Sequence, residues 1–159
     1  MENTQMKKVF GQFSSSITQR PTALGPVNII LDSQEETYGK EHQMDFNESG
    51  DVSITSSGTY FIIAGLQISK LVGDKPRWID FWLRVNNVDL RNSNIRAVLR
   101  DHTSKDVIIT QTISRLNKND KLNIMMSVET ADEGLGIEAI RPKGEPLIPS
   151  IILTILQLV

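Results

Sequence analysis

The sequence of 159 residues contains no cysteine, which excludes disulfide bonds, thiolate zinc sites and cysteine nucleophiles. No hydrophobic run is long enough to cross a bilayer as a helix, because the most apolar stretch, 151–159, has only nine residues and is interrupted twice by polar side chains. The polar N-terminus leads to no apolar stretch of signal-peptide length. An excess of positive charge is also missing, since the net charge is −2, and the composition therefore predicts neither a nucleic-acid partner nor a membrane.

Alanine is scarce, with 5 residues against 19 isoleucines, whereas threonine, serine and asparagine together supply 35 residues. β-branched side chains favour strands, and a shortage of strong helix formers disfavours helices. From residue 27 onward, short apolar or alternating segments are separated by Gly, Pro, Asn and Asp turns. The sequence therefore predicts an all-β sandwich or barrel of about nine or ten strands.

The chain has the length of one domain, and its two ends differ in pattern. Residues 1–26 are weakly periodic and are expected to form either an N-terminal arm or a first strand, whereas 27–159 form a single domain. The polar, acidic interval 32–49 predicts a surface loop. The segment 59–69 is apolar on both faces, so each of its faces needs cover, from the core on one side and from a loop or another subunit on the other.

The sequence offers little catalytic chemistry. The two histidines, His42 and His102, lie in predicted loops and lack the spacing of a metal site or a catalytic triad. We therefore expect no catalytic residue, no metal and no cofactor, and predict that the protein is not an enzyme. The alternative of a cupin-like enzyme requires a clustered set of histidine and carboxylate ligands that two loop histidines do not supply.

The segment 78–86 alternates cleanly and places four side chains on the polar face of a predicted strand: Trp78, Asp80, Trp82 and Arg84. Two indole rings on one face of a strand can stack on a sugar or another aromatic ligand. Alternatively, a loop or a neighbouring subunit covers them. The Asn86-Asn87 pair that follows predicts a tight turn, because asparagine tolerates positive φ.

Residues 51–64, DVSITSSGTYFIIA, resemble the strand–Gly–x–Tyr–x–strand signature of C1q/TNF-like jelly rolls. Residues 83–87 and 116–122 resemble two further turns of that family, with Asn87 and Asn119 in place of its glycines. The resemblance covers about residues 51–159 and implies a ten-stranded jelly-roll sandwich that forms a homotrimer. By register it implies Phe61, Ile63 and Ile109 at the trimer interface, and it turns the side chains of 60, 62 and 64 toward the core.

Within this family the chain resembles bacterial members from spore-forming bacilli. That likeness implies a structural or adhesion head domain that displays its loops on a spore surface (exosporium) or another extracellular surface, after synthesis in the cytosol without a signal peptide. The expected partners are further copies of the chain and either a spore-surface filament protein or a surface glycan. Two alternatives remain at this point: the receptor-binding tip of a phage or viral fibre, and a carbohydrate-binding module that uses the two tryptophans.

Overall fold

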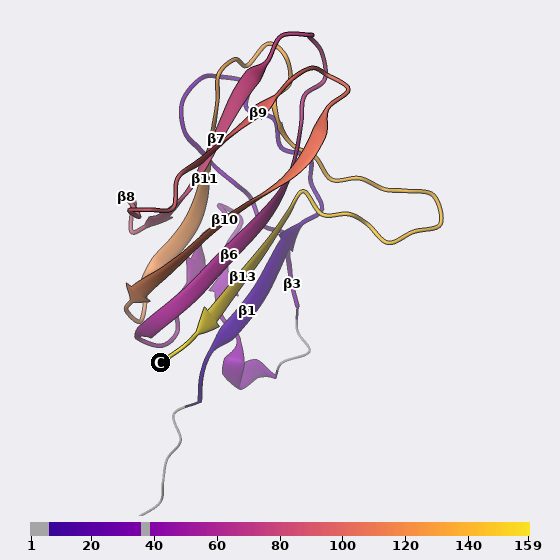
Figure 1. Ribbon diagram of the computed structural model, residues 1–159. Coiled ribbons are helices and arrows are strands. Elements are labelled where there is room, and N and C mark those ends of the chain that lie inside the picture. The colour runs from indigo at the N-terminus through magenta and orange to yellow at the C-terminus, as the bar shows by residue number, and fades with distance from the viewer. Residues whose placement is uncertain (1–6, 36–38) are drawn as a thin grey trace, which may run out of the picture.

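The computed structural model describes residues 7–35 and 39–159, which form two antiparallel β-sheets packed face to face (Figure 1). Sheet A has the spatial order β10-β6-β13-β1-β3, and β12 also pairs with β6. Sheet B has the order β4-β5-β11-β7-β8, while β2 pairs with β11 and β9 pairs with β7. The described residues contain no α-helix, and one 3-10 turn spans Lys40–His42. The prediction of an all-β sandwich is therefore confirmed.

The strands of both sheets follow the alternating segments of the sequence. Those of sheet A are β1 (Phe10–Ser15), β3 (Ser33–Gln34), β6 (Gly58–Ser69), β10 (Lys105–Leu116), β12 (Gly136–Ile137) and β13 (Ile151–Gln157). Those of sheet B are β2 (Val27–Asn28), β4 (Asp45–Phe46), β5 (Val52–Ser53), β7 (Arg77–Val85), β8 (Val88–Asp89), β9 (Ile95–Leu99) and β11 (Lys121–Val128).

The chain crosses between the sheets at almost every connection. Among eight strands taken in chain order, β1, β5, β6, β7, β9, β10, β11 and β13, only the step from β7 to β9 stays within one sheet. The short strands β4 and β12 each lie in the same sheet as the strand that follows them. Both ends of the described chain lie at one end of the sandwich (Figure 1). The segment between β12 and β13 projects from the sandwich as a long loop, and a bridge between Ile140 and Ile148 pairs its two arms (Figure 1).

The core lies between the two sheets and is built by the period-2 alternation of their strands. On β6, Tyr60, Ile62 and Ala64 are completely buried, which confirms the prediction that they face the core. On β7, Ile79 and Phe81 are buried in the same way from the opposite sheet. The other side chains of β6 consequently point out of the sandwich, away from the core.

The prediction that 32–49 is only a surface loop is wrong. Two short strands lie in it, β3 beside β1 and β4 beside β5, and Met44 between them is fully buried. The ring of Phe46 packs edge-on against Phe13 of β1, with ring centroids 5.7 Å apart. Strands of two residues are too short to show alternation, so the sequence pattern does not reveal them.

Asparagines occupy the tight turns, as the sequence predicts. Asn86 and Asn87 have φ of 49° and 65°, and Asn119 has φ of 74°. Asn86 also ties two turns together, because its Nδ2 donates to Asp120 Oδ1 at 2.8 Å and its Oδ1 accepts from the backbone N–H of Lys121 at 2.9 Å. These turns fix the register of β7 and β11, which pair directly in sheet B.

Candidate functional site

The outward side of sheet A carries exposed apolar side chains from neighbouring strands. Pairing aligns Ile113 of β10 with Phe61 of β6, Leu156 of β13 and Phe10 of β1 in one row across the sheet. Four residues earlier on β10, Ile109 lies in a row with Gly65 and Ile152. Ile113 is 64% exposed and Ile109 is 56% exposed. Single exposed aliphatic side chains are common on proteins, so the informative feature is that these two lie on one sheet face with further apolar side chains.

We call this surface the uncharged face. It comprises three parallel rows of outward side chains on β10, β6, β13 and β1, namely Ile113, Phe61, Leu156 and Phe10; Gln111, Ile63, Thr154 and Gln12; and Ile109, Gly65, Ile152 and Ser14. None of the twelve is charged, although 23% of the chain is Asp, Glu, Lys or Arg. The middle row is the most polar, and Gln12 Nε2 donates to Thr154 Oγ1 at 3.5 Å. Such a surface can be buried without leaving an unpaired charge.

Phe61, Ile63 and Ile109, the three residues that the family resemblance implies for an interface, all lie on the uncharged face. Phe61 and Ile63 are partly exposed, on the opposite side of β6 from the buried core residues. Sequence reasoning missed Ile113 and Leu156, which lie on either side of Phe61 in one row. The alternation of residues 107–113 could have placed Ile113 on the same face as Ile109. The position of Leu156 beside Phe61 follows only from the pairing of β13 with β6.

The uncharged face is hollowed at two places on either side of Thr154. One hollow of about 190 Å³ lies over Gly65 between Ile63, Ile109 and Ile152. The other hollow, of about 270 Å³, lies between β1 and β13 and is bordered by Gln12 and by the row of Phe10 and Leu156. Both hollows are lined mainly by apolar side chains and open outward from sheet A.

The outward side of sheet B holds the predicted ligand surface of Trp78, Asp80, Trp82 and Arg84, all on β7. The Arg96 guanidinium of β9 lies 4.2 Å from the centroid of the Trp78 ring. It also pairs with Asp80 through two hydrogen bonds, Nε to Oδ1 at 2.7 Å and Nη2 to Oδ2 at 2.8 Å. The face of Trp78 toward this arginine is therefore occupied by a cation–π contact within the chain.

Trp82 is only 9% exposed. Its indole Nε1 donates to Asp89 Oδ1 at 2.7 Å, and Arg84 donates to the same oxygen at 2.7 Å. The hydrogen bond from Arg84, and to a smaller extent that from Trp82, holds the pKa of Asp89 below its usual range. Sequence reasoning missed Asp89 and Arg96, because both reach their partners only through the pairing of β8 and β9 with β7.

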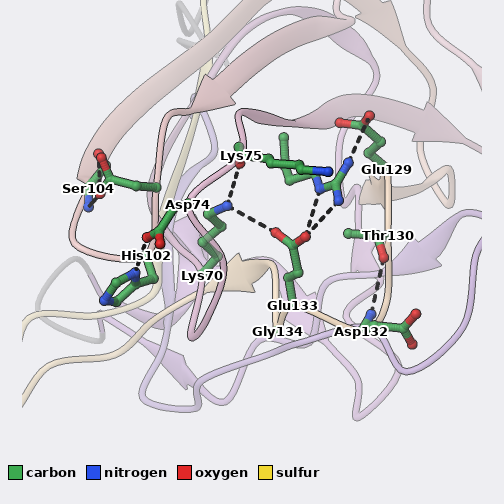
Figure 2. A network of polar contacts seen from close by, with 12 residues as sticks. Lys70, Asp74, Lys75, His102, Ser104, Glu129, Thr130, Asp132, Glu133 and Gly134 are labelled. Carbon is green, nitrogen blue, oxygen red and sulfur yellow. Dashed lines mark hydrogen bonds and ion pairs between the residues drawn. The ribbon is translucent and has the colours of Figure 1, made fainter.

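A network of charged side chains joins the loops at one end of the sandwich (Figure 2). The buried Lys70 Nζ donates to Glu133 Oε2 at 3.0 Å and to the Lys75 carbonyl at 2.6 Å. Arg77 donates to Glu133 Oε1 through Nε at 2.9 Å and Nη2 at 2.7 Å, and it also faces Glu129. The hydrogen bonds from Arg77 and Lys70 lower the pKa of Glu133 to about 2. Glu133 is thus a carboxylate that clamps the loop after β6 to the loop after β11.

The two histidines make contacts of a different kind. His102 Nδ1 lies 3.0 Å from Asp74 Oδ1 on the surface, and the ring of His42 stacks on Phe10 at a centroid distance of 5.0 Å. Among residues 7–35 and 39–159, no group of three or more His, Asp or Glu side chains is arranged to hold a metal ion. The same residues include no helix long and apolar enough to cross a membrane.

Comparison of the chain with protein-family models and with curated proteins finds no match.

Proposed function

We propose that the chain is a C1q/TNF-like jelly-roll head domain that assembles as a homotrimer through the uncharged face. In this role it is a structural or adhesion module rather than an enzyme, and it displays its loops on a bacterial spore or cell surface. The uncharged face is the observation that carries the proposal. The resemblance of residues 51–64 to the family signature supports the family, and the likeness of the chain to bacterial members from spore-forming bacilli supports the location.

The strand order supports the jelly-roll assignment. With the short edge strands set aside, sheet A contains the first, eighth, third and sixth strands of the chain in the order β1-β13-β6-β10. Sheet B contains the second, seventh, fourth and fifth, in the order β5-β11-β7-β9. Two antiparallel sheets connected in this crossing manner are the architecture of a double Greek key.

The energetics favour burial of the uncharged face. Full burial of one isoleucine side chain contributes about 1.5–3 kcal/mol. Because Ile109 and Ile113 are already partly covered, burying what remains of each contributes about 1–2 kcal/mol per protomer. A closed trimer repeats each contribution three times, and the sum partly offsets the entropic cost of bringing the chains together.

The test is the molar mass in solution, measured by light scattering on a size-exclusion column. A chain of 17.8 kDa predicts about 53 kDa for the trimer. Phe61→Asp and Ile109→Asp each place a charge on the uncharged face, and we expect them to give a monomer or an aggregate. Val88→Asp is the matched control, because Val88 is 68% exposed on sheet B, and it should remain a trimer. A wild-type mass near 17.8 kDa at all concentrations, or trimeric Phe61→Asp, would contradict the proposal.

Display on a surface is tested separately from assembly. We expect an antibody against the purified domain to label intact spores or cells of the source organism. Labelling only after the cells are broken open would contradict display.

A further inference from the structure

Gly65 lies in the interior of β6, a strand of twelve residues in the middle of sheet A. Glycine is unfavourable inside a strand, because it loses more conformational freedom on folding than any other residue and has no side chain to pack. A glycine at such a position therefore calls for a structural reason, either a backbone conformation or a close approach of other atoms.

The chain supplies such a reason for every glycine except Gly65. Six have positive φ, namely Gly25, Gly39, Gly50, Gly73, Gly134 and Gly144. Three others would place a Cβ within 3 Å of another atom, at 2.7 Å for Gly11, 2.4 Å for Gly58 and 2.1 Å for Gly136. A Cβ on Gly65 would meet nothing within 4 Å, and its φ is not in the positive region. As far as a single copy of the chain is concerned, an alanine therefore fits at this position without strain.

The missing side chain creates a hollow in the uncharged face. Ile63, Ile109 and Ile152 form its walls together with Thr154, and its volume is about 190 Å³. An apolar cavity of about 150 Å³ holds a benzene molecule. The hollow over Gly65 is thus large enough for one leucine or isoleucine side chain, and its walls match such a side chain in chemistry.

We infer that the hollow over Gly65 receives an aliphatic side chain from a second copy of this chain. This inference rests on the proposed trimer and specifies the position at which the copies interlock. A second copy fits because the surface around the hollow carries no charge and itself presents exposed aliphatic side chains, with Ile113 the most exposed of them. A glycine in a strand is a position where another chain can approach closely, which is the requirement that the single chain leaves unexplained.

The inference is tested with variants that fill the hollow from within the same chain. Gly65→Leu occupies the space intended for the neighbouring copy, and Gly65→Ala occupies part of it. Gln67→Leu is the matched control, because Gln67 lies two residues further along the same face of β6 and does not line the hollow. Light scattering over a dilution series gives the association of each variant, and circular dichroism and thermal unfolding report on the fold of its monomer.

We expect Gly65→Leu to weaken trimer association by about tenfold or more, with Gly65→Ala intermediate and Gln67→Leu close to wild type. The folded monomer should be at least as stable in Gly65→Ala as in wild type, because a glycine inside a strand is replaced without a clash. If Gly65→Leu does not fold, the trimer association of Gly65→Ala is compared with that of Gln67→Leu, and weaker association of Gly65→Ala alone supports the inference. If the wild type is trimeric and both Gly65 variants associate as strongly as the wild type, the proposed role of the hollow is overturned but the proposed trimer is not. A monomeric wild type would overturn both.

Discussion

Tyr60 provides a test of the core that depends on pH. Its side chain is completely buried on β6, and its hydroxyl donates one hydrogen bond to the Ser56 carbonyl at 2.6 Å. Tyr60→Phe removes this hydrogen bond and leaves the ring in place, so no large cavity forms. Removing a neutral hydrogen bond of this kind costs about 1 kcal/mol. We therefore expect Tyr60→Phe to lower the free energy of unfolding by about 1 kcal/mol at pH 8.

The same substitution should lose its effect in alkaline solution. Burial raises the pKa of Tyr60 from 10.0 to about 12 in the folded chain. The folded state therefore keeps the proton that the unfolded state releases above pH 10, and the stabilisation linked to Tyr60 is lost as the pH rises from 10 to 12. At pH 11 this loss amounts to about 1 kcal/mol in wild type. Phenylalanine has no such proton, so the two proteins should become about equally stable.

Urea unfolding at pH 8 and pH 11, followed by tryptophan fluorescence at one protein concentration, measures both effects. All other ionisable groups are the same in the two proteins, so their contributions cancel in the difference. An unchanged gap of about 1 kcal/mol at both pH values would refute the argument, because Tyr60 would then ionise with its ordinary pKa. A gap of zero at pH 8 would instead show that the hydrogen bond to Ser56 contributes nothing.

Two further predictions concern a turn and the loop clamp. Asn87 has φ of 65° in the turn between β7 and β8, so Asn87→Gly should preserve or raise the melting temperature. Asn87→Ala should lower the free energy of unfolding, measured in urea, by about 1 kcal/mol. Equal stability of the two variants would contradict the role of positive φ. Glu133 has a folded pKa of about 2, below its usual 4.5, so its stabilisation is present above pH 4.5 and is lost as the pH falls toward 2. Glu133→Gln should therefore be less stable than wild type at pH 7, and the difference should narrow at pH 3; a constant difference between pH 7 and pH 3 would count against the clamp.

The sequence predicted the parts of the fold that alternation and turn chemistry control. Period-2 patterning placed Tyr60 and Ile62 on the same face of their strand, and the register implied by the family resemblance turned that face toward the core, where both are buried. Asn87 and Asn119 were assigned to tight turns because asparagine accepts positive φ. Both signals depend on neighbouring residues in the chain, and both are confirmed.

Features that depend on which strands pair could not be predicted in this way. Glu133 and Lys70 lie 63 positions apart, and only the meeting of their two loops makes them partners. The pairing of Arg96 with Asp80 likewise follows from the register of β9 against β7. The significance of Gly65 became visible only when the space around it was known, because a glycine in a sequence does not reveal whether its own chain requires it.

The outward face of sheet B carries charged side chains, whereas the uncharged face of sheet A carries none, and this difference indicates which face another chain can cover. On sheet B, the charged side chains Asp80 and Arg84 are engaged in ion pairs with Arg96 and Asp89, beside the two tryptophans. Covering them requires removal of water from charged groups, which often costs more than the ion pair returns. The twelve residues of the uncharged face of sheet A carry no such penalty. The proposed trimer would therefore form through sheet A, leaving the ion pairs of sheet B uncovered and the end loops free to contact another molecule.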